Sequence, residues 1–395
     1  MKRYVFLLLI LLIAVVVDAQ PIDPTVPSEH WELYRALETR LTEFEGRLSK
    51  LPKPDKETDV VFGAELLTAN GHRGEQLLSP QAFDGNVVYL DKLQEIGIRA
   101  VKVAIPYPLL MPRFPRSKEY TAFYARLAQE IHRRGMKMHV GCGVMFPQSE
   151  FTTVPKELLD YSKLTVDEFF EQRKRQVEII AGECSPDYLT IANEPSTERK
   201  LTGLDLTPAG YVGYIGETVR KIRRPGMVIC AGAGSWDNPA YAQAFVAIPD
   251  LDCLDLHFYP IDSTYQASLI QLIDPARRNQ KRVIIGEAWL YKSLNASGSE
   301  ATWAPTFGLD VFSFWQTLDQ RFIEDMVRLA RNGGVEQISF FWSKYFFGYD
   351  DYDEKTRRLE PGVLLKLGNQ AAWKAIQDGQ LSVAGRTYQR LIKGK

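Results

Sequence analysis

Hydrophobic residues fall into short, unbroken runs along most of this chain, separated by longer stretches in which apolar positions recur at helical spacing. Unbroken apolar runs are typical of parallel strands that are buried on both faces of a sheet. The alternation of such runs with helical stretches therefore predicts a sheet built from repeated strand–helix units. The expected strands lie at 60–66, 99–105, 136–142, 187–192, 227–233, 254–258, 282–288 and 335–342.

The expected helices begin and end at residues typical of helix boundaries. Thr165 and Glu168 form a capping-box pattern, and Gly333-Gly334 would end a long helix that starts near Leu309. Eight strand–helix units in succession predict an α/β protein with a single (β/α)8 barrel domain and enlarged loops. A doubly wound sheet is the alternative fold, but no glycine-rich phosphate fingerprint follows the first strand.

The N-terminus carries the pattern of an export signal. A basic start precedes an apolar run at 6–17, and a small-residue cleavage site follows at 17–19. This run is too short to span a bilayer comfortably, so we expect a signal peptide at 1–19 and a secreted or periplasmic protein. An anchor that is not cleaved is the alternative; after cleavage we expect no stable membrane insertion.

A helical extension is expected at 20–58, between the signal and a barrel domain at 59–395. Its helix, at about 28–51, carries a single apolar stripe. Docking of this stripe on the barrel is favoured over pairing with a second chain, because a coiled coil normally needs more heptads. The oligomeric state stays open. The stripe consists of Leu37, Leu41, Phe44, Leu48 and Leu51.

Charge and cysteine usage exclude some partners and a metal cluster. The 395 residues include 48 basic and 49 acidic side chains, a net charge of −1. This balance provides no field that would attract nucleic acid or an anionic membrane, whereas an uncharged carbohydrate substrate is compatible with it. The four cysteines lack the short spacing of a metal site, so buried free thiols are expected.

Two of the expected strands end on a carboxylate. The fourth runs into Asn193-Glu194, and the seventh runs into Gly286-Glu287. The carboxyl ends of barrel strands face the mouth at which barrel enzymes build their sites. Strands four and seven lie on opposite sides of such a barrel, so the two glutamates can converge to about 5 Å, the separation that a retaining glycosidase uses.

These strand ends resemble clan A of the glycoside hydrolases, the superfamily of cellulases, mannanases and galactanases, over about residues 59–395. In that clan an Asn-Glu pair ends strand four, and a glutamate ends strand seven. The resemblance implies that Glu194 is the acid/base, that Glu287 is the nucleophile, and that Asn193 donates to the sugar 2-hydroxyl.

Further strand ends agree with this resemblance. It implies that His257 and Tyr259, at the end of strand six, face the site and that Tyr259 hydrogen-bonds the nucleophile. It also implies that Trp342, at the end of strand eight, forms the floor beneath the reacting sugar. Trp289, directly after strand seven, is expected to contribute to substrate binding.

Two positions depart from the clan pattern. Lys102 on strand two stands where the clan often has an arginine, and 141–143 on strand three is Gly-Cys-Gly where many members have a histidine. We still expect Lys102 to belong to the substrate site, since lysine can pair with Glu287, although without the bidentate fork of arginine. The departures argue against the best-known cellulase and mannanase branches.

The sequence as a whole predicts a secreted retaining glycoside hydrolase that acts on a poly- or oligosaccharide, with β-linked bonds expected, by double displacement. Glu194 would carry a proton at the first step and act as a base at the second. No cofactor is expected, and no metal, because the histidines and acids lack metal-ligand spacing. A catalytically impaired barrel that still binds carbohydrate is the alternative, and a scaffold that associates through the N-terminal helix is a third possibility.

Glu65, at the end of the first strand, is a third carboxylate near the expected mouth of the barrel. It has two interpretations, binding to substrate hydroxyls or ordinary surface polarity. We favour surface polarity, since most glutamates are exposed. The loop at 72–75 has the same two interpretations.

Overall fold

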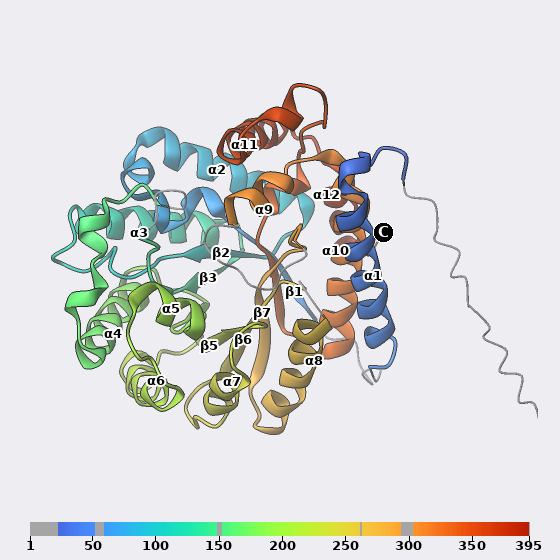
Figure 1. Cartoon of the computed structure of the whole chain (residues 1–395). Coiled ribbons are helices and arrows are strands. Elements are labelled where there is room, and N and C mark those ends of the chain that lie inside the picture. The colour runs from blue at the N-terminus through green and yellow to red at the C-terminus, as the bar shows by residue number, and fades with distance from the viewer. Residues whose placement is uncertain (1–22, 52–58, 148–151, 261–262, 294–302, 395) are drawn as a thin grey trace, which may run out of the picture.

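The computed structural model describes residues 23–51, 59–147, 152–260, 263–293 and 303–394; the expected signal peptide lies outside these ranges. Eight parallel strands close into a barrel in chain order, with β8 hydrogen-bonded to β1 (Figure 1). The (β/α)8 prediction is confirmed, and the doubly wound alternative, whose sheet stays open, is excluded. The strands are β1 Val61–Glu65, β2 Ala100–Ala104, β3 Lys137–Gly141, β4 Tyr188–Thr190, β5 Val228–Gly234, β6 Cys253–Phe258, β7 Arg282–Ala288 and β8 Gln337–Phe340.

Helices cover the outside of the barrel (Figure 1), and side chains cap the N-termini of α2, α4, α6, α7 and α12. Thr165 Oγ1 accepts a hydrogen bond from the backbone N–H of Glu168 at 3.2 Å, and Glu168 Oε2 accepts from the backbone of Thr165 at 2.9 Å. This capping box begins α4 as predicted. The helices are α1 Trp31–Leu48, α2 Pro80–Ile96, α3 Ser117–Arg133, α4 Val166–Glu183, α5 Pro195–Thr202, α6 Pro208–Ile222, α7 Pro239–Val246, α8 Ser263–Arg278, α9 Trp303–Leu309, α10 Gln316–Gly333, α11 Pro361–Asp378 and α12 Val383–Lys393.

One helix boundary differs from the prediction. The long helix expected to start near Leu309 begins instead at Gln316, as α10. A turn separates it from α9, because the Trp315 indole N–H donates to the Leu309 carbonyl at 2.8 Å and Phe312 forms a bridge with Asp350. Tertiary pairing with the loop after β8 therefore interrupts a stretch that local periodicity alone would continue.

The N-terminal helix α1 packs along α10 and α8 on one side of the barrel (Figure 1). Its apolar stripe is buried from Leu37 to Leu48. The ring centroid of Phe44 lies 5.2 Å from that of Phe258 on β6, and the Arg321 guanidinium of α10 donates to Glu45 at 2.8 Å. The stripe therefore docks on the barrel within the same chain.

All four cysteines are buried, and none forms a disulfide, as expected from their spacing. Their thiols behave as small apolar groups of the core. Within the described ranges, no helix has both the length and the apolar character that crossing a bilayer requires.

Candidate active site

A cavity of about 800 Å³ opens at the carboxyl end of the barrel strands. Its size falls within the range of small-ligand sites, and its lining includes residues at or just beyond the ends of all eight strands. Five of the eight residues expected in the site line it. These are Asn193, Glu194, Tyr259, Glu287 and Trp342.

Glu194 lies beyond the end of β4, and the chain turns directly into α5 after it. Asp237 holds this turn, because its carboxylate accepts hydrogen bonds from the backbone N–H groups of Ser196 at 2.7 Å and Gly234 at 2.6 Å. One turn further on, Glu198 forms a buried ion pair with Arg173 at 2.8 Å. These contacts fix the direction in which the Glu194 side chain leaves the strand.

Glu287 is aimed by a β-bulge. His257 pairs with Glu287 although Leu256 pairs with Ile285, so Gly286 is the extra residue on β7. The backbone N–H of Gly286 donates to Asp255 Oδ1 at 2.8 Å, and a Cβ on Gly286 would lie 2.4 Å from that oxygen. Glycine is therefore required at this position for the bulge and the buried aspartate to coexist.

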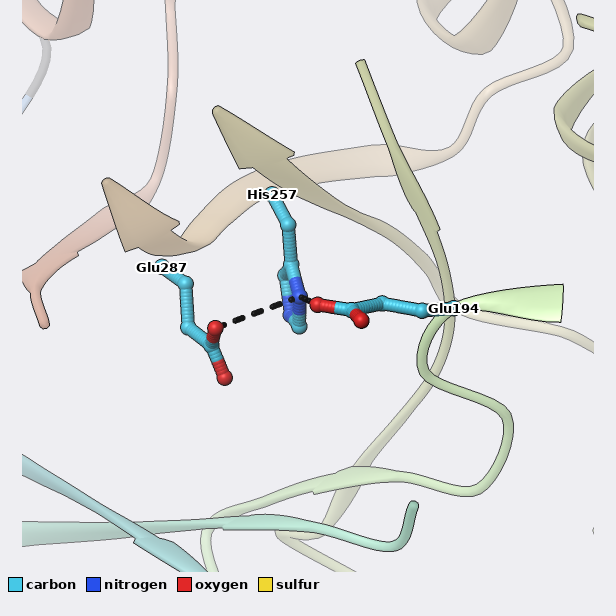
Figure 2. A group of neighbouring side chains, drawn as sticks. All are labelled: Glu194, His257 and Glu287. Carbon is cyan, nitrogen blue, oxygen red and sulfur yellow. Dashed lines mark hydrogen bonds and ion pairs between the residues drawn. The ribbon is translucent and has the colours of Figure 1, made fainter. Parts of the chain in front are cut away.

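The two glutamates face each other across the cavity from opposite sides of the barrel (Figure 2). An oxygen of Glu194, an oxygen of Glu287 and a ring nitrogen of His257 all lie within 4.8 Å of one another. Carboxyl groups about 5 Å apart are typical of retaining glycosidases, whereas inverting enzymes separate them by roughly 6.5–9.5 Å to admit a water molecule. The distance between these two oxygens is compatible with the retaining arrangement.

Glu287 is surrounded by hydrogen-bond donors. Lys102 Nζ donates to its Oε1 at 2.6 Å, and the Tyr259 hydroxyl donates to its Oε2 at 2.9 Å. Burial alone would raise the pKa of Glu287, but the positive charges of His257 and Lys102, together with these hydrogen bonds, lower it below its ordinary value. These interactions favour the ionised form of Glu287.

His257 lies between the two glutamates (Figure 2). Its Nδ1 is 2.6 Å from Glu194 Oε1 and 3.6 Å from Glu287 Oε2. Burial would lower the pKa of His257, and nearby Lys102 opposes its charge, but the negative charge of Glu287 with contributions from Asp255 and Glu194 raises it to about 10. Nδ1 of His257 thus faces both carboxyl groups, while its Nε2 lies 3.2 Å from the Lys102 ammonium.

Asp255 supplies a buried negative charge beneath this cluster, and sequence reasoning missed it. Its Oδ2 accepts a hydrogen bond from Thr190 at 2.7 Å and lies 3.5 Å from a nitrogen of His139. Burial alone would raise the pKa of Asp255, but interactions with His139 and His257 hold it well below its ordinary value. The signal was present, since an acid stands inside an apolar strand two positions before His257, on the same face.

Three residues expected to bind substrate do not line the cavity. Lys102 and His257 are fully buried beneath the glutamates, so they act through those side chains. Trp289 is also fully buried, and the expectation that it binds substrate is wrong. Its ring stacks on Tyr345 at 5.8 Å and meets Phe340 edge-on at 6.4 Å, because a large apolar ring is stabilised more by burial than by exposure at the mouth.

Aromatic rings line one side of the cavity. Trp342 is half-buried and meets Phe307 edge-on at 5.2 Å. Tyr259 stacks on Tyr291 with their centroids 4.2 Å apart, and Trp236 lies 5.5 Å from Tyr259. Flat rings of this kind suit the C–H faces of a sugar ring.

Several buried polar atoms at the cavity have no hydrogen-bond partner among the residues that the structure describes. Such atoms are rare in folded proteins, because leaving a buried donor or acceptor unpaired costs about 1–3 kcal/mol. A ligand rich in hydroxyl groups would satisfy them. They are both carboxyl oxygens of Glu65, Nε2 of His72, Oδ1 of Asn193, Oε1 of Glu198 and Nε1 of Trp342.

Glu194, His257 and Glu287 also offer three ligand atoms close enough for a metal ion. The charges around them do not suit one. The Lys102 ammonium already contacts Glu287 at 2.6 Å, and His257 Nδ1 is already hydrogen-bonded to Glu194 at 2.6 Å. Metal binding would require the imidazole to lose its proton.

No protein-family model matches the chain, and no curated protein matches it in sequence. Solved structures do match. A GH5_18 protein from Bifidobacterium longum superposes with a TM-score of 0.56 at 15% identity, covering 85% of this chain and 79% of that one. The chain shares the barrel fold of glycoside hydrolases. The resemblance found in the strand ends is thus confirmed at the level of the fold.

Two further structures have the same fold. The exo-β-1,4-mannosidase Op5Man5 from an Opitutaceae bacterium has a TM-score of 0.55 at 14% identity, covering 88% of this chain and 61% of that one. A glycoside hydrolase family 5 mannosidase from Rhizomucor miehei has a TM-score of 0.50 at 14% identity, covering 86% of this chain and 96% of that one.

Proposed function

We propose that this protein is a retaining glycoside hydrolase with Glu287 as the nucleophile and Glu194 as the acid/base. The observation that carries the proposal is the pair of opposed carboxyl groups, with oxygens within 4.8 Å of each other across one cavity. The donors around Glu287 support its role, since Lys102 and Tyr259 keep it ionised and oriented.

In the first step, Glu287 attacks the anomeric carbon and the bond to the leaving oxygen breaks, while Glu194 transfers its proton to that oxygen. The negative charge thereby passes from Glu287, now an ester, to Glu194. His257 Nδ1 lies 2.6 Å from Glu194 and 3.6 Å from Glu287, so the same imidazole faces the charge before and after the transfer. The buried cluster keeps its net charge throughout.

In the second step, a water molecule attacks the anomeric carbon from the side of Glu194. Glu194 takes the proton from that water, and Glu287 departs as a carboxylate. Both side chains return to their starting protonation states, and the sugar keeps its original anomeric configuration. Asn193 lines the cavity beside Glu194 and would donate to the sugar 2-hydroxyl, leaving its Oδ1 to accept from another group.

The substrate we propose is a neutral, β-linked glycan, with sugar faces stacked against the cavity rings, chiefly Trp342 and Tyr291. Two of the structures with the same fold are named as mannosidases, which makes β-mannosides the first compounds to assay. We also propose that the protein is exported, on the strength of the N-terminal signal pattern at 1–19.

The alternative of a catalytically impaired binding barrel rested on two departures from the clan pattern. In the structure the two compensate each other. A Cβ on Gly141 would lie 3.1 Å from Cε of Lys102, so the glycine on β3 provides the space through which the lysine reaches Glu287. The nucleophile keeps a cationic partner, and this observation favours catalysis.

Aryl glycoside hydrolysis by single-site variants tests the proposal. Glu287→Ala and Glu194→Ala should each lose nearly all turnover, and azide should restore the activity of Glu194→Ala on activated substrates as a β-glycosyl azide. Glu183→Ala, an exposed glutamate at the end of α4, serves as the control and should match the wild type. Turnover close to wild type in either site variant would refute the assignment.

A further inference from the structure

Glu65 is the last residue of β1, and the proposed mechanism does not use it. Its exposed fraction is 1%, yet its side chain lines the cavity. The interpretation as surface polarity is therefore wrong. The backbone around it is well fixed, since Glu65 pairs with Lys102 across the β1–β2 ladder and its carbonyl accepts a hydrogen bond from Ser343 at 2.5 Å.

Both carboxyl oxygens of Glu65 lack a hydrogen-bond partner among the described residues. Lys102, its partner across the β1–β2 ladder, is already engaged with Glu287 at 2.6 Å. Burial, followed by the negative charge of Glu287, raises the pKa of Glu65 well above its ordinary value, against the opposing charge of Lys102. Burial without a cation of its own favours the protonated form of this carboxyl group, which offers one O–H donor and one carbonyl acceptor.

The position of Glu65 places it beside the reacting sugar. In the barrel, β1 lies between β2, which carries Lys102, and β8, which leads to Trp342. A sugar ring that rests on Trp342 and presents its anomeric carbon to Glu287 would therefore turn one edge toward β1. Glu65, Glu194 and Glu287 all line the same cavity, so the three carboxyl groups surround one binding space.

We propose that Glu65 binds a hydroxyl of the sugar unit that becomes attached to Glu287 and so selects the configuration of that hydroxyl. This inference rests on the proposed glycosidase function. A neutral carboxyl can donate to one hydroxyl and accept from a second, so an epimer that redirects either bond leaves a buried polar group unpaired. Sites built in this way discriminate strongly against analogues that lack the partner group.

The test uses 2,4-dinitrophenyl β-glycosides of the sugar that the wild type hydrolyses best, together with the analogues that lack one ring hydroxyl each. In the wild type, removal of the hydroxyl bound by Glu65 should lower kcat/KM about 10- to 100-fold. On the parent glycoside, Glu65→Leu should lose a similar factor in kcat/KM relative to the wild type. Its kcat/KM for that one analogue should then lie little below its own value for the parent. Glu65→Gln, which keeps a donor and an acceptor, should stay within about threefold of the wild type.

Several results would overturn the inference. Equal losses of activity in Glu65→Leu for the parent and for every deoxy analogue would mean a purely structural role. A shifted pH profile with an unchanged deoxy series would mean that Glu65 acts only on the charge of Glu287. If Glu65→Leu does not fold, Glu65→Gln decides, because a loss above about 100-fold would mean that an ionised carboxylate is needed.

These outcomes are distinct from failure of the glycosidase proposal. In that case the wild type would hydrolyse none of the parent glycosides, and Glu287→Ala would behave like the wild type. Hydrolysis by the wild type that Glu287→Ala abolishes, combined with a deoxy series that Glu65→Leu leaves unchanged, would reject the role of Glu65 alone.

Discussion

Replacement of Lys102 by methionine removes the ammonium that contacts the nucleophile. The Lys102 side chain is fully buried, and its Nζ lies 2.6 Å from Glu287 Oε1. Removal of one partner from a buried ion pair typically costs about 3–5 kcal/mol of folding free energy, because the other charge is left uncompensated. For a domain of this size, at about 2 °C per kcal/mol, Tm should fall by roughly 6–10 °C.

The same substitution should change the pH dependence of catalysis. Lys102 is one of the two cations that lower the pKa of Glu287 against the effect of burial. Without it, the pKa of Glu287 rises, and the acid limb of kcat/KM, which reports the free enzyme, should move to higher pH. Measurement of kcat/KM on an aryl glycoside from pH 3 to 9 would show this shift.

The stabilisation of the folded protein by ionised Glu287 should also depend on pH. A carboxylate whose folded-state pKa is lowered stabilises the protein above its unfolded-state pKa, and this contribution is lost as pH falls through the folded-state value. The gap in Tm between wild type and Lys102→Met should therefore be largest near neutral pH and should narrow in acid. Lys102→Arg, which keeps the charge, is the control. An unmoved acid limb in a folded Lys102→Met protein would refute this account of how Glu287 is kept ionised.

Two further expectations concern the scaffold. Gly286→Ala places a Cβ 2.4 Å from the buried Asp255 oxygen, so the bulge must shift. As a result, kcat/KM should fall by about 100-fold or more. Full activity would mean that the bulge does not aim Glu287. Phe44→Ala leaves a cavity at a fully buried site on α1 beside Phe258. The free energy of unfolding, measured with denaturant, should fall by about 3–5 kcal/mol. A decrease below about 1 kcal/mol would argue against docking of α1 on the barrel.

The barrel could be predicted because its strands are buried on both faces. Such strands appear in sequence as unbroken apolar runs, and all eight lie within or close to the expected ranges. The opposed glutamates could also be located, since a strand that ends on an acid places it at the mouth whatever the loops do. Tyr259 likewise reaches Glu287.

Side chains whose direction depends on packing could not be placed from sequence. Trp289 follows a strand end just as Trp342 does, yet one is fully buried and the other lines the cavity. Glu65 was assigned to the surface from the usual preference of glutamate, but its position between β2 and β8 buries it. The start of α10 depended on a contact with the loop after β8, which no local pattern encodes.

Trapping of the glycosyl-enzyme tests the central claim most directly. The wild type would be incubated with the 2,4-dinitrophenyl 2-deoxy-2-fluoro-β-glycoside of its preferred sugar, digested, and mapped by mass spectrometry. We expect one fluoroglycosyl group per chain, attached to the peptide that contains Glu287. Attachment to any other residue, or no attachment in a sample that hydrolyses the parent glycoside, would contradict the assignment of Glu287 as the nucleophile.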